Sequence, residues 1–138
     1  MDNKLNITAI VQARTTSSRF PRKVLQKING KTIMQIIHSR LKKSNFIDKI
    51  VFAIPKNDKE KELKKHLKKN KFILFEGKDH DVLDRYYSTA KKFKSNIIVR
   101  ITGDCPLIDY QLIDSMMKIF LNNKFDCVLN YSPPTFPD

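Results

Sequence analysis

The sequence predicts an α/β fold with three layers, in which a mostly parallel sheet carries helices on both faces. Short apolar runs alternate along the chain with longer segments whose apolar residues recur at helical spacing. The first run, at residues 7–11, is almost continuously apolar, which is typical of a strand buried on both faces. Alternating strands and helices favour a parallel sheet because each helix returns the chain across one face by a right-handed crossover.

Each predicted element rests on a local pattern of apolar residues, and a few residues mark its ends. The predicted strands lie at residues 7–11, 50–54, 72–75 and 97–101, with a fifth short strand expected at residues 128–129. The predicted helices lie at residues 33–41, 57–70, 82–93 and 112–120. A turn at Gly30 leads to Thr32, the expected N-cap of the first helix, and Pro55 ends the second strand. The second helix is rich in lysine, so we expect it to be mostly solvated.

The length and composition fit one domain, which we expect to span residues 1–138. The 138 residues are 41% hydrophobic, and 27 Lys and Arg against 14 Asp and Glu give a formal net charge of +13. Such a charge favours partners that carry phosphate, although lysines on solvated helix surfaces account for much of it. No apolar run approaches the ~20 residues of a membrane-spanning helix, and residues 1–8 contain no signal-peptide core. We therefore expect a cytoplasmic protein that has no membrane partner.

The loop after the first strand is the most unusual segment of the chain. Residues 12–23 contain four cations and four hydroxyl side chains but no acid. Its cations, which are suited to surround a polyphosphate, are Arg14, Arg19, Arg22 and Lys23. Ligands of open α/β sheets bind at the carboxyl ends of strands, which favours this interpretation over a solvated basic turn. The loop is neither a P-loop nor a dinucleotide fingerprint, because the required glycines are missing.

A second polar loop follows the fourth predicted strand. Asp104 lies there between Gly103 and Pro106, at a strand end where a carboxylate can hold a divalent metal ion. The alternative is an aspartate that only forms hydrogen bonds within its own turn. Asp84 and Arg85 lie in the first turn of the third helix, where they can reach a ligand above the sheet. The histidines and cysteines show no metal-ligand spacing.

Three motifs, in the same order, resemble those of the spore-coat-polysaccharide-type cytidylyltransferases. These enzymes are relatives of the acylneuraminate and 3-deoxy-manno-octulosonate cytidylyltransferases. The matching segments are residues 9–25, 81–87 and 99–109. The resemblance implies the glycosyltransferase-A-like nucleotidyltransferase fold, of which this chain would form the N-terminal portion. It also implies transfer of CMP from CTP to a sugar or sugar acid for surface polysaccharide biosynthesis, with release of pyrophosphate.

The resemblance also implies roles for individual residues. Arg14 and Lys23 match the catalytic cations that grip the triphosphate, and Arg19 lies near them in sequence. Ala13 matches the position where the backbone meets the nucleotide, and Asp104 matches a magnesium-binding aspartate. The segment near the nucleoside is matched by Asp84 and Arg85. The implied ligands are CTP, Mg²⁺ and a small sugar substrate, and the full-length family suggests a homodimer.

Two departures from the family pattern leave alternatives open. Arg22 stands where the family usually has glycine, so it is strained if the site requires a positive φ and otherwise adds a cation. Family members are longer, and residues 135–138 look like the start of a Gly-Leu-Asp-x-Glu motif with another metal-site acid. We therefore expect a domain that is incomplete at its C-terminus. The alternative functions are a catalytically incomplete nucleotide-binding fragment and a basic nucleic-acid-binding module, although few arginines and no aromatic-interleaved basic patch support the module.

Overall fold

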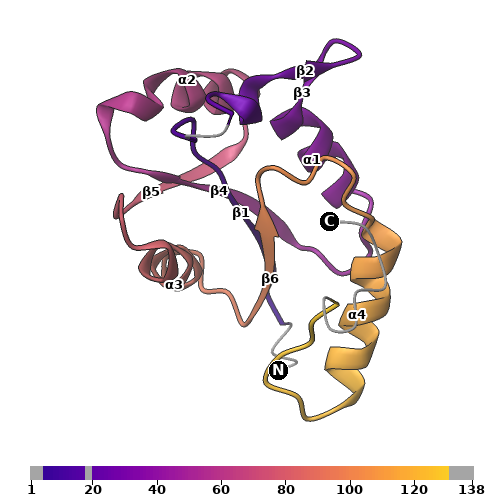
Figure 1. The fold of residues 1–138 in the computed structure, drawn as a ribbon. Coiled ribbons are helices and arrows are strands. Elements are labelled where there is room, and N and C mark those ends of the chain that lie inside the picture. The colour runs from indigo at the N-terminus through magenta and orange to yellow at the C-terminus, as the bar shows by residue number, and fades with distance from the viewer. Residues whose placement is uncertain (1–4, 18–19, 131–138) are drawn as a thin grey trace.

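A computed structural model of the chain describes residues 5–17 and 20–130. Within these ranges, four parallel strands form one sheet in the order β5-β4-β1-β6 (Figure 1). The strands are β1 (Ile7–Gln12), β4 (Lys49–Pro55), β5 (Ile73–Gly77) and β6 (Ile97–Thr102). The four longer strands predicted from the sequence are confirmed.

Helices cover both faces of this sheet. The helices α1 (Ile33–Leu41), α2 (Lys61–Lys69) and α4 (Tyr110–Asn122) pack on one face, where they share an apolar cluster with β1 and β4. On the other face, α3 (Val82–Lys92) places Tyr86 and Ala90 against Ile10 of β1. The predicted three-layer α/β fold is confirmed (Figure 1). No helix in the described ranges is long and apolar enough to cross a membrane.

The central strand β1 is buried on both faces, as its apolar run predicts. Residues 7–11 are at most 6% exposed. Ala9 and Val11 pack towards α1, α2 and α4, whereas Ile10 packs towards α3. Hydrogen bonds from β4 and β6 hold both edges of the strand. The carboxyl end of β1, where the basic loop begins, is therefore fixed by the core of the protein.

The start of α1 is fixed by a capping box and is preceded by a short hairpin. The side chain of Thr32 accepts a hydrogen bond from the backbone N–H of Gln35, whose own side chain accepts from the backbone N–H of Thr32. This capping box confirms Thr32 as the N-cap. Just before it, Asn29 and Gly30, both with positive φ, join β2 (Lys27–Ile28) to β3 (Lys31–Thr32) in a small antiparallel hairpin. The sequence analysis predicted the turn but not the hairpin.

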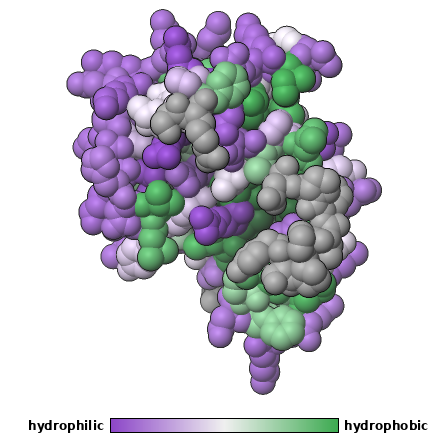
Figure 2. All heavy atoms as spheres, in the orientation of Figure 1, coloured by the Kyte–Doolittle hydropathy of each residue, from purple (hydrophilic) through white to green (hydrophobic). Residues whose placement is uncertain are grey.

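The lysine-rich helix is solvated as predicted. Leu63 and Leu67 are fully buried, while the lysines between and around them are exposed or half-buried. Figure 2 shows hydrophilic side chains gathered over α2, at the upper left of the view. The first residues of the predicted helix form a separate 3-10 turn, η2 (Asp58–Glu60), which is capped by Asn57. Much of the positive charge of the chain therefore lies on this helix surface, away from the core.

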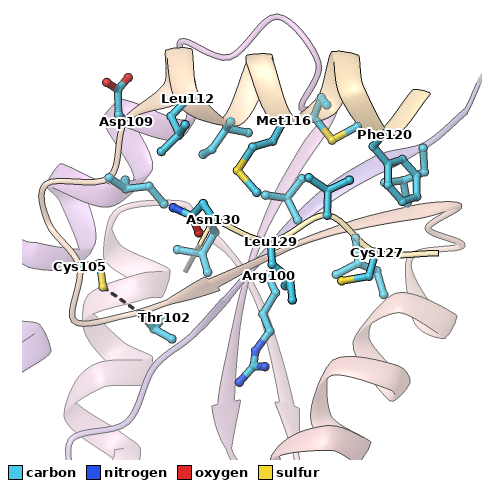
Figure 3. A pocket seen from close by; sticks show the side chains of 18 of the residues that line it. Arg100, Thr102, Cys105, Asp109, Leu112, Met116, Phe120, Cys127, Leu129 and Asn130 are labelled. Carbon is cyan, nitrogen blue, oxygen red and sulfur yellow. Dashed lines mark hydrogen bonds between the residues drawn. The ribbon is translucent and has the colours of Figure 1, made fainter. Parts of the chain in front are cut away.

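The predicted fifth strand is wrong. Residues 128–129 form neither a helix nor a strand, and Leu129 is 62% exposed. Both residues line a cavity of about 650 Å³ between β6 and α4 (Figure 3). Two apolar residues are too few to fix the register of a strand, so tertiary packing decided their conformation.

Candidate functional site

The loops after β1 and β6 meet at the carboxyl edge of the sheet. The backbone N–H of Gly103 donates to the carbonyl oxygen of Gln12 at 2.7 Å. A Cβ atom at position 103 would lie 2.6 Å from that oxygen and 3.0 Å from Cβ of Ala13. Ala13 is also held from the other side, because its N–H donates to the carbonyl oxygen of Ala53 in β4. Only glycine at position 103 allows the two loops to approach this closely.

Lys23 and Asp104 form an ion pair across these two loops. Nζ of Lys23 lies 2.9 Å from Oδ2 of Asp104. Lys23 begins the 3-10 turn η1 (Lys23–Leu25), and Asp104 follows β6. The hydrogen bond from Lys23 lowers the pKa of Asp104, and it outweighs burial, which acts in the opposite direction. Thus the cation and the carboxylate that the sequence singles out separately lie in one place.

The backbone of the basic loop folds around Thr15. The carbonyl oxygen of Thr15 accepts hydrogen bonds from the N–H groups of Ser17 and Arg22. Its own N–H donates to both carboxylate oxygens of Glu60, at 2.8 and 3.1 Å. Sequence reasoning missed Glu60, which is an acid among lysines in the sequence. The one sequence feature that could have indicated a role for Glu60 is its position shortly after the second buried strand.

Arg22 occupies a backbone conformation that favours glycine. Its φ is 59° and its ψ is 18°, which is the left-handed region. The site therefore requires a positive φ, so of the two alternatives the strained one applies. The guanidinium also pairs with Glu62 in α2, and both side chains are more than half exposed. Such an exposed ion pair contributes little stability to compensate for the strain.

Arg14 is exposed at the start of the loop, and its charge acts on the buried Arg85. Burial lowers the pKa of Arg85, and the charge of Arg14 lowers it further, whereas Asp79 and Glu60 raise it. Nη1 of Arg85 donates to the carbonyl oxygens of Lys78 and Asp79. Arg85 thus supports the loop after β5, and its Nε is buried without a hydrogen-bond partner in the described residues.

Asp84, a further predicted site residue, forms its contacts at the start of α3 and in the loop before it. The backbone N–H of Asp84 donates to Oδ1 of Asp81, the N-cap of α3, at 2.8 Å, and the carboxylate of Asp84 pairs with Lys78 at 3.3 Å. Arg19 lies outside the described residues. The roles predicted for Asp84, Arg85 and Arg19 in nucleotide binding stay predictions.

The donor set at Asp104 fits a metal ion only together with a phosphate-bearing ligand. No group of three or more His, Cys, Asp or Glu side chains within residues 5–17 and 20–130 is placed to hold a metal ion. Asp104 already binds one cation, the ammonium group of Lys23. Magnesium characteristically uses one or two carboxylates plus substrate phosphates and water. A single carboxylate beside a basic loop is therefore consistent with such a site.

The cavity beside β6 adjoins the loop that carries Asp104. Its lining includes Thr102 and Cys105 at one end and Met116 and Phe120 of α4 at the other (Figure 3). Oγ1 of Thr102 lies 3.1 Å from Sγ of Cys105. Cys105 and Cys127, which both line the cavity, are free thiols. The cavity is mostly apolar, and the described residues of the basic loop do not line it.

Known proteins resemble the chain over most of its length. A family profile described as cytidylyltransferase matches residues 8–135. An uncharacterized protein of Methanocaldococcus jannaschii is 39% identical over 124 residues, which are 90% of this chain and 51% of that protein. The spore coat polysaccharide biosynthesis protein SpsF of Bacillus subtilis is 32% identical over 125 residues, which are 88% of this chain and 52% of SpsF. The chain thus spans about half the length of these relatives.

Solved structures show the same fold. A cytidylyltransferase from Leptospira borgpetersenii superposes with a TM-score of 0.81 at 35% identity, over 87% of this chain and 50% of that one. A CMP:2-keto-3-deoxy-manno-octonic acid synthetase complexed with CTP superposes with a TM-score of 0.76 at 19% identity, over 86% of this chain and 48% of that one. The predicted nucleotidyltransferase fold is confirmed. Because the family profile matches nearly all of its residues, this chain belongs to the cytidylyltransferase family.

Proposed function

We propose that the chain binds CTP and serves in the transfer of CMP to a sugar or sugar acid, with release of pyrophosphate. The observation that carries this proposal is the ion pair between Lys23 and Asp104, which joins the basic loop after β1 to the acidic loop after β6. Family membership supplies the nucleotide and the reaction class. Surface polysaccharide biosynthesis is the process we propose for the product, by analogy with SpsF.

In this reaction a hydroxyl oxygen of the acceptor attacks the α-phosphorus of CTP, and pyrophosphate leaves. The protein contributes by positioning the groups and by offsetting negative charge on the phosphoryl oxygens. We assign that task to Arg14 and Lys23, with Arg19 as a further cation, and to the fixed backbone at Ala13. Asp84 and Arg85 are proposed to lie near the nucleoside.

Asp104 is the residue that would hold a magnesium ion. Magnesium bound there would neutralise charge on the triphosphate and orient it. Lys23, released from Asp104, would then bind phosphate oxygens. The ion pair thus keeps both groups in place at the same edge of the sheet before the nucleotide arrives.

The cytoplasmic location and the homodimer expected for full-length relatives belong to this proposal as well. So does the view that the chain is one nucleotide-binding domain. An alternative is that these residues bind the nucleotide but do not complete catalysis alone. Measuring nucleotide binding separately from CMP transfer distinguishes this alternative from the full activity.

Thermal unfolding in the presence of nucleotides tests the proposal. CTP with magnesium should raise the melting temperature more than ATP, GTP or UTP, because a ligand that binds only the folded state stabilises it. Arg14→Ala and Lys23→Ala should abolish this shift, whereas Lys65→Ala, on the exposed surface of α2, should retain it. Equal shifts with all four nucleotides, or none, would contradict the assignment of CTP. Tight binding to random duplex DNA with a steep salt dependence would instead favour the nucleic-acid-binding alternative.

A further inference from the structure

Glu60 is a buried carboxylate to which neither the sequence motifs nor the proposed reaction gives a role. It is 1% exposed and lies at the end of η2, directly after the β4 strand. Its own N–H donates to the side chain of Asn57, which caps this turn at 3.2 Å. A buried carboxylate destabilises a protein unless hydrogen bonds compensate for its lost hydration. The partners of Glu60 therefore indicate why it is there.

The hydrogen bonds of the Glu60 carboxylate lead to the basic loop. Both of its oxygens accept from the backbone N–H of Thr15, at 2.8 and 3.1 Å. The neighbouring carbonyl oxygen of Lys59 accepts from Oγ1 of Thr15 at 3.2 Å. Thr15 is itself only 7% exposed. The η2 turn thus holds one residue of the loop by its backbone and by its side chain.

Thr15 in turn organises the cations of the loop. It directly follows Arg14 in the chain, so its backbone position sets where the Arg14 side chain starts. Its carbonyl oxygen accepts from the N–H of Arg22 at 2.9 Å, next to Lys23. One buried residue therefore connects the two cations that we propose to bind the triphosphate.

We propose that Glu60 is a positioning residue, which fixes the basic loop so that Arg14 and Lys23 present their charges to one triphosphate. This inference rests on the proposed function, but the anchoring itself does not. Electrostatics supports it, because Arg14 and Arg85 repel each other and the charge of Glu60 acts on Arg85 in the opposite sense. A neutral residue at position 60 would lose the charge that strengthens these hydrogen bonds, and with it this compensation.

Asp114 offers a matched control elsewhere in the fold. It is 8% exposed, and its carboxylate accepts from the backbone N–H and the side-chain amide of Asn45 and from the hydroxyl of Ser44. It therefore ties the loop after α1 to α4, as Glu60 ties the basic loop to η2. A neutral substitution at either position removes a buried charge and weakens a loop anchor. Only the substitution at Glu60 should affect the nucleotide site.

The experiment compares Glu60→Gln and Asp114→Asn with the unmodified chain by urea unfolding, amide hydrogen exchange and calorimetric titration with CTP and magnesium. Both variants should lose global stability. Glu60→Gln should also speed exchange of the backbone N–H groups of residues 13–17, 20, 22 and 23 by roughly tenfold or more. It should weaken CTP binding by a similar factor. Asp114→Asn should change neither. Glu60→Asp, which keeps the charge, should partly restore both.

Two outcomes separate the anchor from the proposed function. Loop exchange in Glu60→Gln is compared with the increase that its loss of global stability predicts and with the exchange of the same residues in Asp114→Asn. If it exceeds neither, Glu60 does not position the loop. If the unmodified chain does not bind CTP, the proposed function is contradicted, while the exchange data still decide whether Glu60 anchors the loop. Should Glu60→Gln fail to fold, Thr15→Val removes only the contact with Lys59. It should give a smaller rise in exchange over the same residues, and no rise would overturn the inference.

Discussion

Lys23 and Asp104 are 81 positions apart in the sequence, yet Nζ of Lys23 lies 2.9 Å from Oδ2 of Asp104. In the proposed reaction each of them has a different partner, a phosphate oxygen for the lysine and a metal ion for the aspartate. Binding of nucleotide with metal therefore exchanges one ion pair for two new contacts. The pair is partly exposed, so it adds little to folding stability. In the proposed function, its main consequence concerns binding.

Asp104→Asn should therefore affect CTP binding differently with and without magnesium. With magnesium, the affinity for CTP should fall by about tenfold, because the amide is a poorer metal ligand than the carboxylate. Without magnesium, the affinity should stay the same or increase, because Lys23 is freed and a negative charge is removed. Lys23→Met should weaken CTP binding both with and without magnesium. Calorimetric titrations with magnesium and with a chelator measure these affinities, and an equal loss for Asp104→Asn in both would refute a metal-binding role.

Gly103→Ala should destabilise the fold by about 1–3 kcal/mol, which is the usual effect of overpacking a well-packed site. The added Cβ would lie 2.6 Å from the carbonyl oxygen of Gln12, and that oxygen belongs to the buried strand β1. Neither loop can move away without breaking the hydrogen bond between them. Urea unfolding measures the change, with Lys65→Ala in α2 as an exposed control. A free energy of unfolding equal to that of the control would show that the two loops are farther apart than described.

Arg22→Gly should be more stable than Arg22→Ala by about 1 kcal/mol, because a Cβ atom is unfavourable in the left-handed region. Both substitutions remove the ion pair with Glu62, so the comparison between them isolates the backbone conformation. Urea unfolding of the two variants at one pH gives this difference. Equal stabilities would mean that position 22 does not keep a positive φ in solution.

The sequence predicts which two loops lie together, because their proximity follows from topology. Lys23 and Asp104 come from loops at the carboxyl ends of two parallel strands, and such loops share one edge of the sheet. This rule needs only the order of the elements, which the apolar runs of β1 and β6 already show. The Thr32 cap is similarly local, since a capping box involves residues three positions apart.

Features that depend on packing were not predictable in this way. Glu60 lies among lysines, and only the position of η2 against the basic loop makes it a buried anchor. Nothing in the sequence indicated that Arg85 is buried and that its guanidinium donates to the carbonyl oxygens of Lys78 and Asp79 in the loop after β5. Residues 128–129 resemble a strand in composition, yet they line a cavity instead. The hairpin was within reach of the sequence, because Asn29-Gly30 is a strong signal for such a turn.

Two histidines should make the stability of the fold sensitive to mild acid. Burial lowers the pKa of His38, whose ring stacks on Phe72 with 4.1 Å between centroids, and Lys42 lowers it further. Burial also lowers the pKa of His66, whose Nε2 lies 2.9 Å from Oγ1 of Thr32, and Lys69 and Lys27 add to this effect. As the pH falls below the unfolded value of about 6.5, the unfolded chain binds protons first, so the folded state loses stability.

The melting temperature should therefore decrease between about pH 7.5 and 5.5, where carboxylates do not titrate. The lowered pKa values of Asp104 and Asp114 act in a different range, because their stabilisation is present above the unfolded value of about 3.9 and is lost only below it. A double substitution, His38→Phe with His66→Gln, should flatten the profile between these pH values while keeping the ring stack and a hydrogen-bonding group. His80→Gln, at an exposed position, should leave the profile unchanged. If the double variant keeps the full acid sensitivity, groups other than these two histidines are responsible for it.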